Sequence, residues 1–296
     1  MTVKVHSVDN AHKVFKERYS IGHEHTYVHD LDASPMKFVP SGFYSIRRKS
    51  DNKKMFAKIQ KKNDNLFDDE LKVTRQIDKA YKNKTARKLI SLPKYIYRSK
   101  NSQVLVFDLP SGIFDFEPFN MSTQITLMHP SAVSKFGYDL VRAVKYLHEL
   151  GFSHGFIHQS NIFYDHIKYK ESDDSEDDEG YSADPEDTYD NFVQQNFNIP
   201  GFFLTNFSYA CGKNVCQEQY ISDIKNVPDF KEYIHPALLS KKSFTLREAQ
   251  LNDWFAIFKI FTGPYAEPPA IFNTFQIEGI PFLSFAKQKA LELGQF

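Results

Sequence analysis

The hydrophobic pattern of this 296-residue chain changes character once, at Pro110. Before that point, short runs rich in aromatic and β-branched residues predict strands at 43–46, 55–59, 94–97 and 104–107, with one helix over 66–80. After it, apolar residues at helical spacing predict helices over 133–150, 251–261 and 285–293. We therefore expect an α+β fold, with a β-rich first part and a mainly α second part.

The composition excludes several classes of protein. A hydrophobic content of 41% is ample for a buried core. Only two cysteines occur, Cys211 and Cys216, which are too few for a disulfide framework or a four-ligand zinc site. No apolar run approaches the roughly 20 residues that span a bilayer, and the first residues lack a signal-peptide core. These features predict an intracellular protein, nuclear or cytoplasmic, with no membrane span.

A net charge of zero conceals a strong asymmetry along the chain. Residues 171–190 carry eleven acidic side chains and no Lys or Arg, which leaves 37 basic residues against 26 acidic ones elsewhere. Such a run repels itself and has no hydrophobic period, so it is predicted to be a disordered acidic insertion on the surface. One interpretation is a solvated insertion; the other is a tether that recruits basic partners or competes with them for the basic body.

The segment His154-Gly-Phe-Ile-His-Gln-Ser-Asn161 has the spacing of a protein-kinase catalytic loop. In that loop an Asp accepts the proton of the substrate hydroxyl, and an Asn holds magnesium. Asn161 stands at the Asn position, but Phe156 stands at the Asp position and accepts no proton. The pattern therefore predicts a kinase shape without kinase chemistry.

This loop resembles that of the vaccinia-related kinases, a branch of the casein-kinase-one group, whose members read His-Gly-Asp-Ile-Lys-x-x-Asn. Residues 57–59, 65–72 and 233–238 are also similar to family motifs, so the resemblance covers 37–263. It implies a protein-kinase-like two-lobed fold, with an N-terminal extension and candidate first strand (1–36), a small lobe (37–110) and a large lobe (111–296). Only 33 residues follow Gly263, so the large lobe is expected to be truncated.

The resemblance also assigns roles to individual residues. Lys58 and Glu70, twelve residues apart, are the candidates for the ion pair that links the nucleotide phosphates to a helix. With Asn161 and Asn206 they form the candidate nucleotide-binding set, and the two asparagines offer at most a weak metal site. His154 and Asp253 are given structural roles, with Asp253 capping the backbone of the loop.

Four departures from the family pattern argue against catalysis. Val39 stands where the phosphate-covering loop needs glycine, Phe156 replaces the catalytic Asp, His158 replaces the loop Lys, and Asn206 replaces the metal-binding Asp. Only Gly42 survives of the three loop glycines, the other two positions being Lys37 and Val39. The chain is expected to have no catalytic residue and to need no cofactor, although weak ATP–magnesium binding is compatible with it.

The sequence thus favours a pseudokinase that acts as a scaffold or allosteric regulator by binding proteins, such as an active kinase or its basic chromatin-associated substrates. One alternative is a low-activity Ser/Thr kinase that binds ATP. Another is a basic nucleic-acid-binding body masked by the acidic loop, suggested by Arg47-Arg48-Lys49 and the lysine pairs at 53–54 and 61–62. Nucleic acid is the less favoured partner because exposed lysines at strand ends are common. A third idea, a metal site at His23, His25 and His29, has only its spacing in support.

Overall fold

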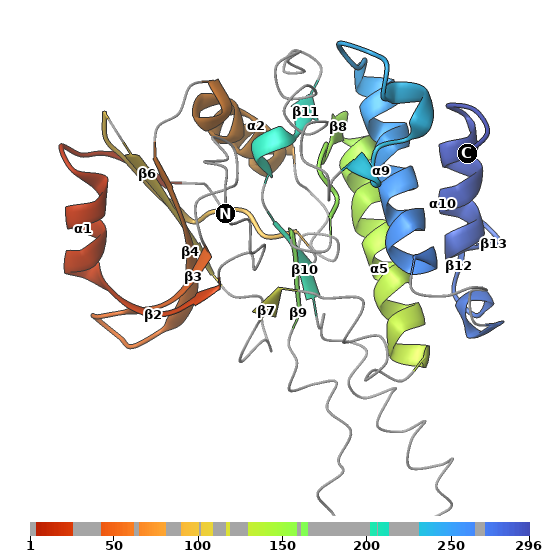
Figure 1. The fold of residues 1–296 in the computed structure, drawn as a ribbon. Helices are drawn as coiled ribbons and strands as arrows, with labels where there is room; N and C mark the ends of the chain where they lie inside the picture. Colours follow the sequence, from red (N-terminus) through yellow and green to blue (C-terminus); the bar gives the residue numbers. More distant parts are fainter. Residues whose placement is uncertain are drawn as a thin grey trace, which may run out of the picture.

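The computed structural model describes residues 4–25, 43–61, 65–80, 90–100, 102–108, 117–118, 130–158, 161–164, 202–205, 207–212, 231–263 and 270–296. Within these ranges the fold is mixed α+β, as the sequence predicts. A six-stranded sheet lies on one side of the molecule and three long helices lie on the other, with a further helix and short strands between them (Figure 1).

The six-stranded sheet has the strand order β1-β5-β6-β4-β3-β2. Its strands are β1 (Lys4–Ser7), β2 (Tyr19–His25), β3 (Phe43–Arg48), β4 (Lys54–Lys61), β5 (Tyr95–Arg98) and β6 (Ser102–Asp108). All neighbours pair antiparallel except β1, which runs parallel to β5. The four strands that the sequence predicts are confirmed as β3, β4, β5 and β6.

Both faces of the sheet are covered, and strand alternation decides which side chain meets which face. On one face, Met55 and Ala57 of β4 pack with Phe15 of helix α1 (Ala11–Arg18). On the other face, Phe56 stacks on Phe107 of β6 with ring centroids 4.5 Å apart. The same alternation turns Lys58 away from α1.

Residues 4–25, the described part of the predicted N-terminal extension (1–36), contribute two strands and a helix. β1 and β2 form the two edges of the sheet, and α1 supplies fully buried Ala11 and Phe15 to its core. A four-residue strand and an eight-residue helix are too short to show a clear hydrophobic period. Their place in the sheet depends on pairing with β5 and β3, which local pattern does not reveal.

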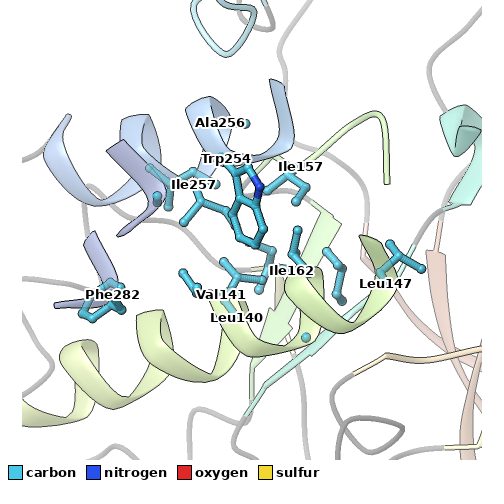
Figure 2. Packing of buried hydrophobic residues seen from close by; sticks show 14 of the residues in the cluster. Leu140, Val141, Leu147, Ile157, Ile162, Trp254, Ala256, Ile257 and Phe282 are labelled. Atoms are coloured by element: carbon cyan, nitrogen blue, oxygen red, sulfur yellow. The ribbon is translucent and has the colours of Figure 1, made fainter. Parts of the chain in front are cut away.

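The helical part of the molecule is built on α5 (Pro130–Glu149), α9 (Leu246–Thr262) and α10 (Phe282–Leu291). They confirm the three helices predicted after Pro110. The predicted stripe of α5 is buried at every position: Val133, Phe136, Leu140, Val144 and Leu147. Trp254 and Ile257 of α9 lie against Leu140 and Val141 of α5, with Phe282 of α10 nearby (Figure 2). Helix α9 is buried almost all round, which accords with its nearly continuous apolar sequence.

Short elements connect these two parts. Helix α2 (Asn65–Ala80) confirms the helix predicted over 66–80. The remaining strands are β7 (Glu117–Pro118), β8 (Phe152–Ser153), β9 (Ile162–Tyr164), β10 (Phe202–Leu204), β11 (Cys211–Gly212), β12 (Gln276–Ile277) and β13 (Ile280–Pro281). Three short 3-10 turns are η3 (Phe207–Tyr209), η4 (Pro236–Leu238) and η5 (Ala270–Asn273). The β9–β10 pair holds the chain on either side of the predicted acidic insertion at 171–190, which lies outside the described residues.

Candidate functional site

The loop that follows α5, residues 151–158, is held in place by one buried carboxylate of α9. The Oδ2 atom of Asp253 accepts the backbone N–H of His154 at 2.8 Å, and Oδ1 accepts that of Gly155 at 3.0 Å. The Nε2 atom of His148, in the last turn of α5, lies 2.9 Å from the same Oδ2. Asp253 is fully buried, so these bonds compensate for its desolvation. Asp253 thus ties the loop to both α5 and α9.

Gly155 allows the loop to approach its neighbour closely. Its φ is +74°, in the left-handed region that glycine adopts without strain. A Cβ atom at this position would lie 2.0 Å from the carbonyl oxygen of Tyr209. The His-Gly opening of the loop is therefore a steric requirement of this fold.

His154 connects the loop to the segment after β10. Its Nε2 atom donates to the carbonyl oxygen of Thr205 at 3.0 Å, while Nδ1 accepts the backbone N–H of Phe156 at 3.3 Å. The imidazole ring also packs on Phe207, with centroids 4.9 Å apart. Burial lowers the pKa of His154 below 6.5, although the negative charges of Asp253 and Glu70 oppose this effect. A neutral ring with its proton on Nε2 satisfies both hydrogen bonds.

Phe156 is part of a buried apolar cluster rather than a polar cleft. The side chain is 7% exposed and packs with Tyr209, Ile234 and Leu238. Its ring meets that of Tyr209 edge-on at 5.0 Å and lies parallel to that of His158 at 6.0 Å. Among the described residues of this cluster, every side chain that packs on Phe156 is apolar or aromatic.

His158 extends the same aromatic packing to the segment that begins at residue 231. Its ring stands edge-on to that of Tyr233, with centroids 4.8 Å apart, and the side chain is buried. Ile234 and Leu238 come from the same segment and contact Phe156. The loop and residues 233–238 therefore form one packed unit.

Asn161 is buried and supports the backbone of the loop. Its Nδ2 atom donates to the carbonyl oxygen of Phe156 at 2.8 Å. Its own carbonyl oxygen accepts the backbone N–H of Thr205 at 3.1 Å. Asn161 thus joins the loop to β10. Asn206, its predicted companion in nucleotide binding, lies outside the described residues.

Lys58 and Glu70 meet between β4 and α2. The Nζ atom of Lys58 lies 2.7 Å and 3.0 Å from the two carboxylate oxygens of Glu70. Their side chains are 0% and 2% exposed, respectively. Burial lowers the pKa of Lys58 below its ordinary value, and the negative charge of Glu70 opposes this. The pair connects the sheet to α2 and is closed to solvent.

The structure therefore brings the predicted residues together in two groups. The loop group contains His154, Phe156, His158, Asn161 and Asp253, and the second group is the Lys58–Glu70 pair. The residues assigned to the phosphate-covering loop (Lys37, Val39 and Gly42) and His29 lie outside the described residues, as do the side chains of His23 and His25.

Four contributors to this site were missed by the sequence analysis. They are His148, Thr205, Tyr209 and Asn252, of which Asn252 accepts the backbone N–H of His235 at 2.8 Å. Asn252 directly precedes Asp253 in the sequence. This adjacency could have indicated that Asn252 also belongs to the site. Thr205 contributes through its backbone carbonyl oxygen. Every residue has this group, so the identity of the side chain could not indicate the role.

The described residues contain no group of three or more His, Cys, Asp or Glu side chains placed to hold a metal ion. No helix in the described part of the chain is both long and apolar enough to cross a membrane. Comparison of the sequence with protein-family models and with curated proteins found no match.

Proposed function

We propose that this chain has a protein-kinase-like two-lobed fold, is a degenerate relative of the vaccinia-related kinases, and acts as a pseudokinase through protein binding. The observation that carries the proposal is the environment of Phe156. It occupies the position of the catalytic Asp and lies in an apolar cluster with Tyr209, Ile234 and Leu238. A kinase requires a carboxylate there to orient and deprotonate the substrate hydroxyl. The cluster supplies packing instead.

The frame around that position supports a kinase-like ancestry. Asp253 accepts two backbone N–H groups of the loop, as the family resemblance implied. Lys58 and Glu70 form an ion pair between a strand of the sheet and α2, which is the arrangement that positions phosphates in active kinases. These contacts are architectural, and they persist when the catalytic Asp is lost.

The environment of Lys58 argues against nucleotide binding. Its ammonium group contacts both carboxylate oxygens of Glu70, and its side chain is fully buried. A phosphate that reached Lys58 would have to open this closed pair and desolvate its own charge. We therefore propose that the protein needs no cofactor.

A low-activity kinase is the second candidate, because the Lys58–Glu70 pair is in place. Thermal unfolding with ATP and magnesium, with ATP and EDTA, and without ligand separates the two proposals. We expect no change in Tm at millimolar nucleotide, because only binding to the folded state raises Tm. A magnesium-dependent rise in Tm that is lost in Lys58→Met would favour the low-activity kinase.

Two substitutions test the cause of inactivity. We expect Phe156→Asp, alone or combined with Asn206→Asp, to show no phosphate transfer from labelled ATP to casein or histone. Phe156→Asp should also lower the free energy of unfolding by about 2–4 kcal/mol, because it places a carboxylate among apolar side chains. Phe156→Leu is the control, and it should lower the free energy of unfolding by less than Phe156→Asp does. Turnover by the double variant would contradict an occluded site.

The proposed partners are proteins, namely an active kinase or its basic chromatin-associated substrates, in the nucleus or cytoplasm. The support is the charge of residues 171–190, with eleven carboxylates and no basic side chain. Binding of purified core histones can be compared between the full chain and a variant whose seven carboxylates in 171–179 are changed to amides. We expect weaker binding by the variant. Equal binding would remove the acidic segment from the proposal.

A further inference from the structure

A basic hollow lies beside α1. Helix α1 lies on the side of the sheet away from α5, α9 and α10 (Figure 1). The volume of the hollow is about 630 Å³, and it is lined by Asn10, Lys13, Lys16, Glu17 and Lys49. All five side chains are exposed. None of them belongs to the site around Phe156, so the hollow requires a separate explanation.

The wall of the hollow is built by hydrogen bonds between α1 and the turn after β3. The backbone N–H of Lys49 donates to the carbonyl oxygen of Arg18 at 2.9 Å. The Nζ atom of Lys49 donates to the carbonyl oxygen of Lys16 at 2.8 Å. These bonds place the ammonium group of Lys49 at the C-terminal end of α1, where a cation also caps the helix.

Asn10 forms the other end of the wall. Its Oδ1 atom accepts the backbone N–H of Lys13 at 3.0 Å and so caps the start of α1. Because Oδ1 is used in this way, the NH₂ group is what Asn10 offers to a ligand. The hollow therefore presents ammonium and amide donors, with Glu17 as its single carboxylate.

Three other basic residues, in or next to strands of this sheet, are paired with carboxylates. Arg48 pairs with Asp51, and Lys53 and Lys94 both pair with Asp108. In contrast, no ion pair with a described residue involves Lys13, Lys16 or Lys49. These three lysines therefore carry positive charge that no described carboxylate within ion-pair distance compensates.

We propose that this hollow binds a short acidic peptide segment of a partner protein, with Lys13, Lys16 and Lys49 pairing with its carboxylates. Ammonium and amide groups are donors that match carboxylate oxygens. Nucleic acid fits less well, because it requires an extended basic stripe along the phosphate backbone. Here the donors that line the hollow are three lysines and one amide, gathered beside a single eight-residue helix.

The test measures fluorescence anisotropy of a labelled 20-residue peptide of alternating Glu and Ser residues, added to the full chain at about 0.1 M salt, where the Debye length is about 10 Å. The variant Lys13→Glu/Lys16→Glu/Lys49→Glu should bind at least about ten-fold more weakly. Glu17→Gln should bind more tightly, because it removes a repulsive charge. Added salt should weaken binding of the unmodified chain, since exposed charges are screened.

A matched control separates local recognition from net charge. Lys72→Glu/Lys79→Glu/Lys242→Glu makes the same change in total charge at exposed lysines outside the hollow. This variant should keep its affinity within about two-fold, because none of its three lysines lines the hollow and exposed charges are screened by salt. An equal loss in both triple variants would overturn the proposal, as would absence of peptide binding by the unmodified chain. Tighter binding of a 20-base-pair DNA duplex, lost in the hollow variant, would assign the surface to nucleic acid instead.

Discussion

Lys58 and Glu70 show how two charged side chains are retained in an apolar setting. Each carries a charge that burial disfavours, and each supplies the partner that the other requires. Their two contacts of 2.7 Å and 3.0 Å are those of a bidentate charge-assisted pair. Removal of one member is therefore expected to cost much more than removal of both.

This expectation gives the first prediction. Lys58→Met leaves the Glu70 carboxylate buried without its partner and should lower the free energy of unfolding by about 3–5 kcal/mol. Lys58→Met/Glu70→Leu removes both charges and should be more stable than the single variant. Urea unfolding of four proteins, the unmodified chain, Lys58→Met, Glu70→Leu and the double variant, measures the coupling. A double variant as unstable as the sum of both single changes would show that the pair is not coupled.

Two buried histidines predict how stability depends on pH. Burial lowers the pKa of His154 and that of His235 below 6.5 in the folded protein. The unfolded chain therefore takes up protons first as pH falls, so stability is full above about pH 6.5 and is lost progressively below it. Urea unfolding at a series of pH values should show this decline.

His235→Asn is the control for that decline. Nδ1 of His235 accepts the backbone N–H of Ala237, and the Asn Oδ1 atom is a common acceptor at such a cap. The variant keeps an acceptor but loses one titrating group, so its stability should fall less steeply below pH 6.5. An unchanged slope would assign the pH dependence to other groups.

At the scale of elements, the loop at 151–158 is defined by contacts on three sides. Asp253 of α9 binds its backbone, the carbonyl of Tyr209 lies against Gly155, and Ile234 and Leu238 pack on Phe156. Together these contacts fasten the loop to α9, to η3 and to the segment at 233–238. A change at one position is thus transmitted to the packing of η3 or of the segment at 233–238.

Gly155 and Gly279 provide a matched pair for testing this packing. Their φ angles are +74° and +77°, but a Cβ atom at Gly279 would have no atom within 4 Å. Gly279→Ala should cost only the conformational strain, about 1–2 kcal/mol. Gly155→Ala should cost about 1–3 kcal/mol more, because the Tyr209 carbonyl must move. If urea unfolding showed the same loss of unfolding free energy for both variants, the loop would be shown to accommodate the added methyl group without extra cost.

At the scale of the whole molecule, the sheet depends on the start of the chain. β1 and β2 form its two edges, and α1 covers the face that carries Met55 and Ala57. The rings of Phe15 and Tyr19 stack at 5.2 Å, and the Tyr19 hydroxyl lies 3.3 Å from that of Tyr97. The N-terminal segment is thus part of the core.

Phe15→Ala tests that conclusion. Because Phe15 is fully buried, the truncation should lower the free energy of unfolding by about 3–5 kcal/mol. Lys13→Ala changes an exposed residue of the same helix and should alter stability by no more than about 0.5 kcal/mol. If the segment were a detached extension, chemical unfolding would give the same value for both variants.

Local pattern was enough to predict the α+β class, the strands β3 to β6, and helices α2, α5, α9 and α10. A strand has a hydrophobic period of 2 residues and a helix one of 3.6, and both periods can be recognised within a short stretch of sequence. The type and place of these elements therefore follow from the sequence alone. The kinase-like loop motif from His154 to Asn161 is also contiguous in sequence. The sequence alone therefore sufficed to predict that Phe156 stands where this motif has its Asp.

Contacts between distant residues were decided only by the tertiary structure. Asp253 binds backbone groups 98 and 99 residues earlier, and His148 reaches it across 105 residues. Likewise, β1 pairs with β5, and Tyr233 packs on His158. No periodic pattern encodes such pairs, because they depend on how helices and strands pack around a shared core. The resemblance implied the role of Asp253, but burial of the Phe156 cluster and closure of the Lys58–Glu70 pair emerge only when all these elements are assembled.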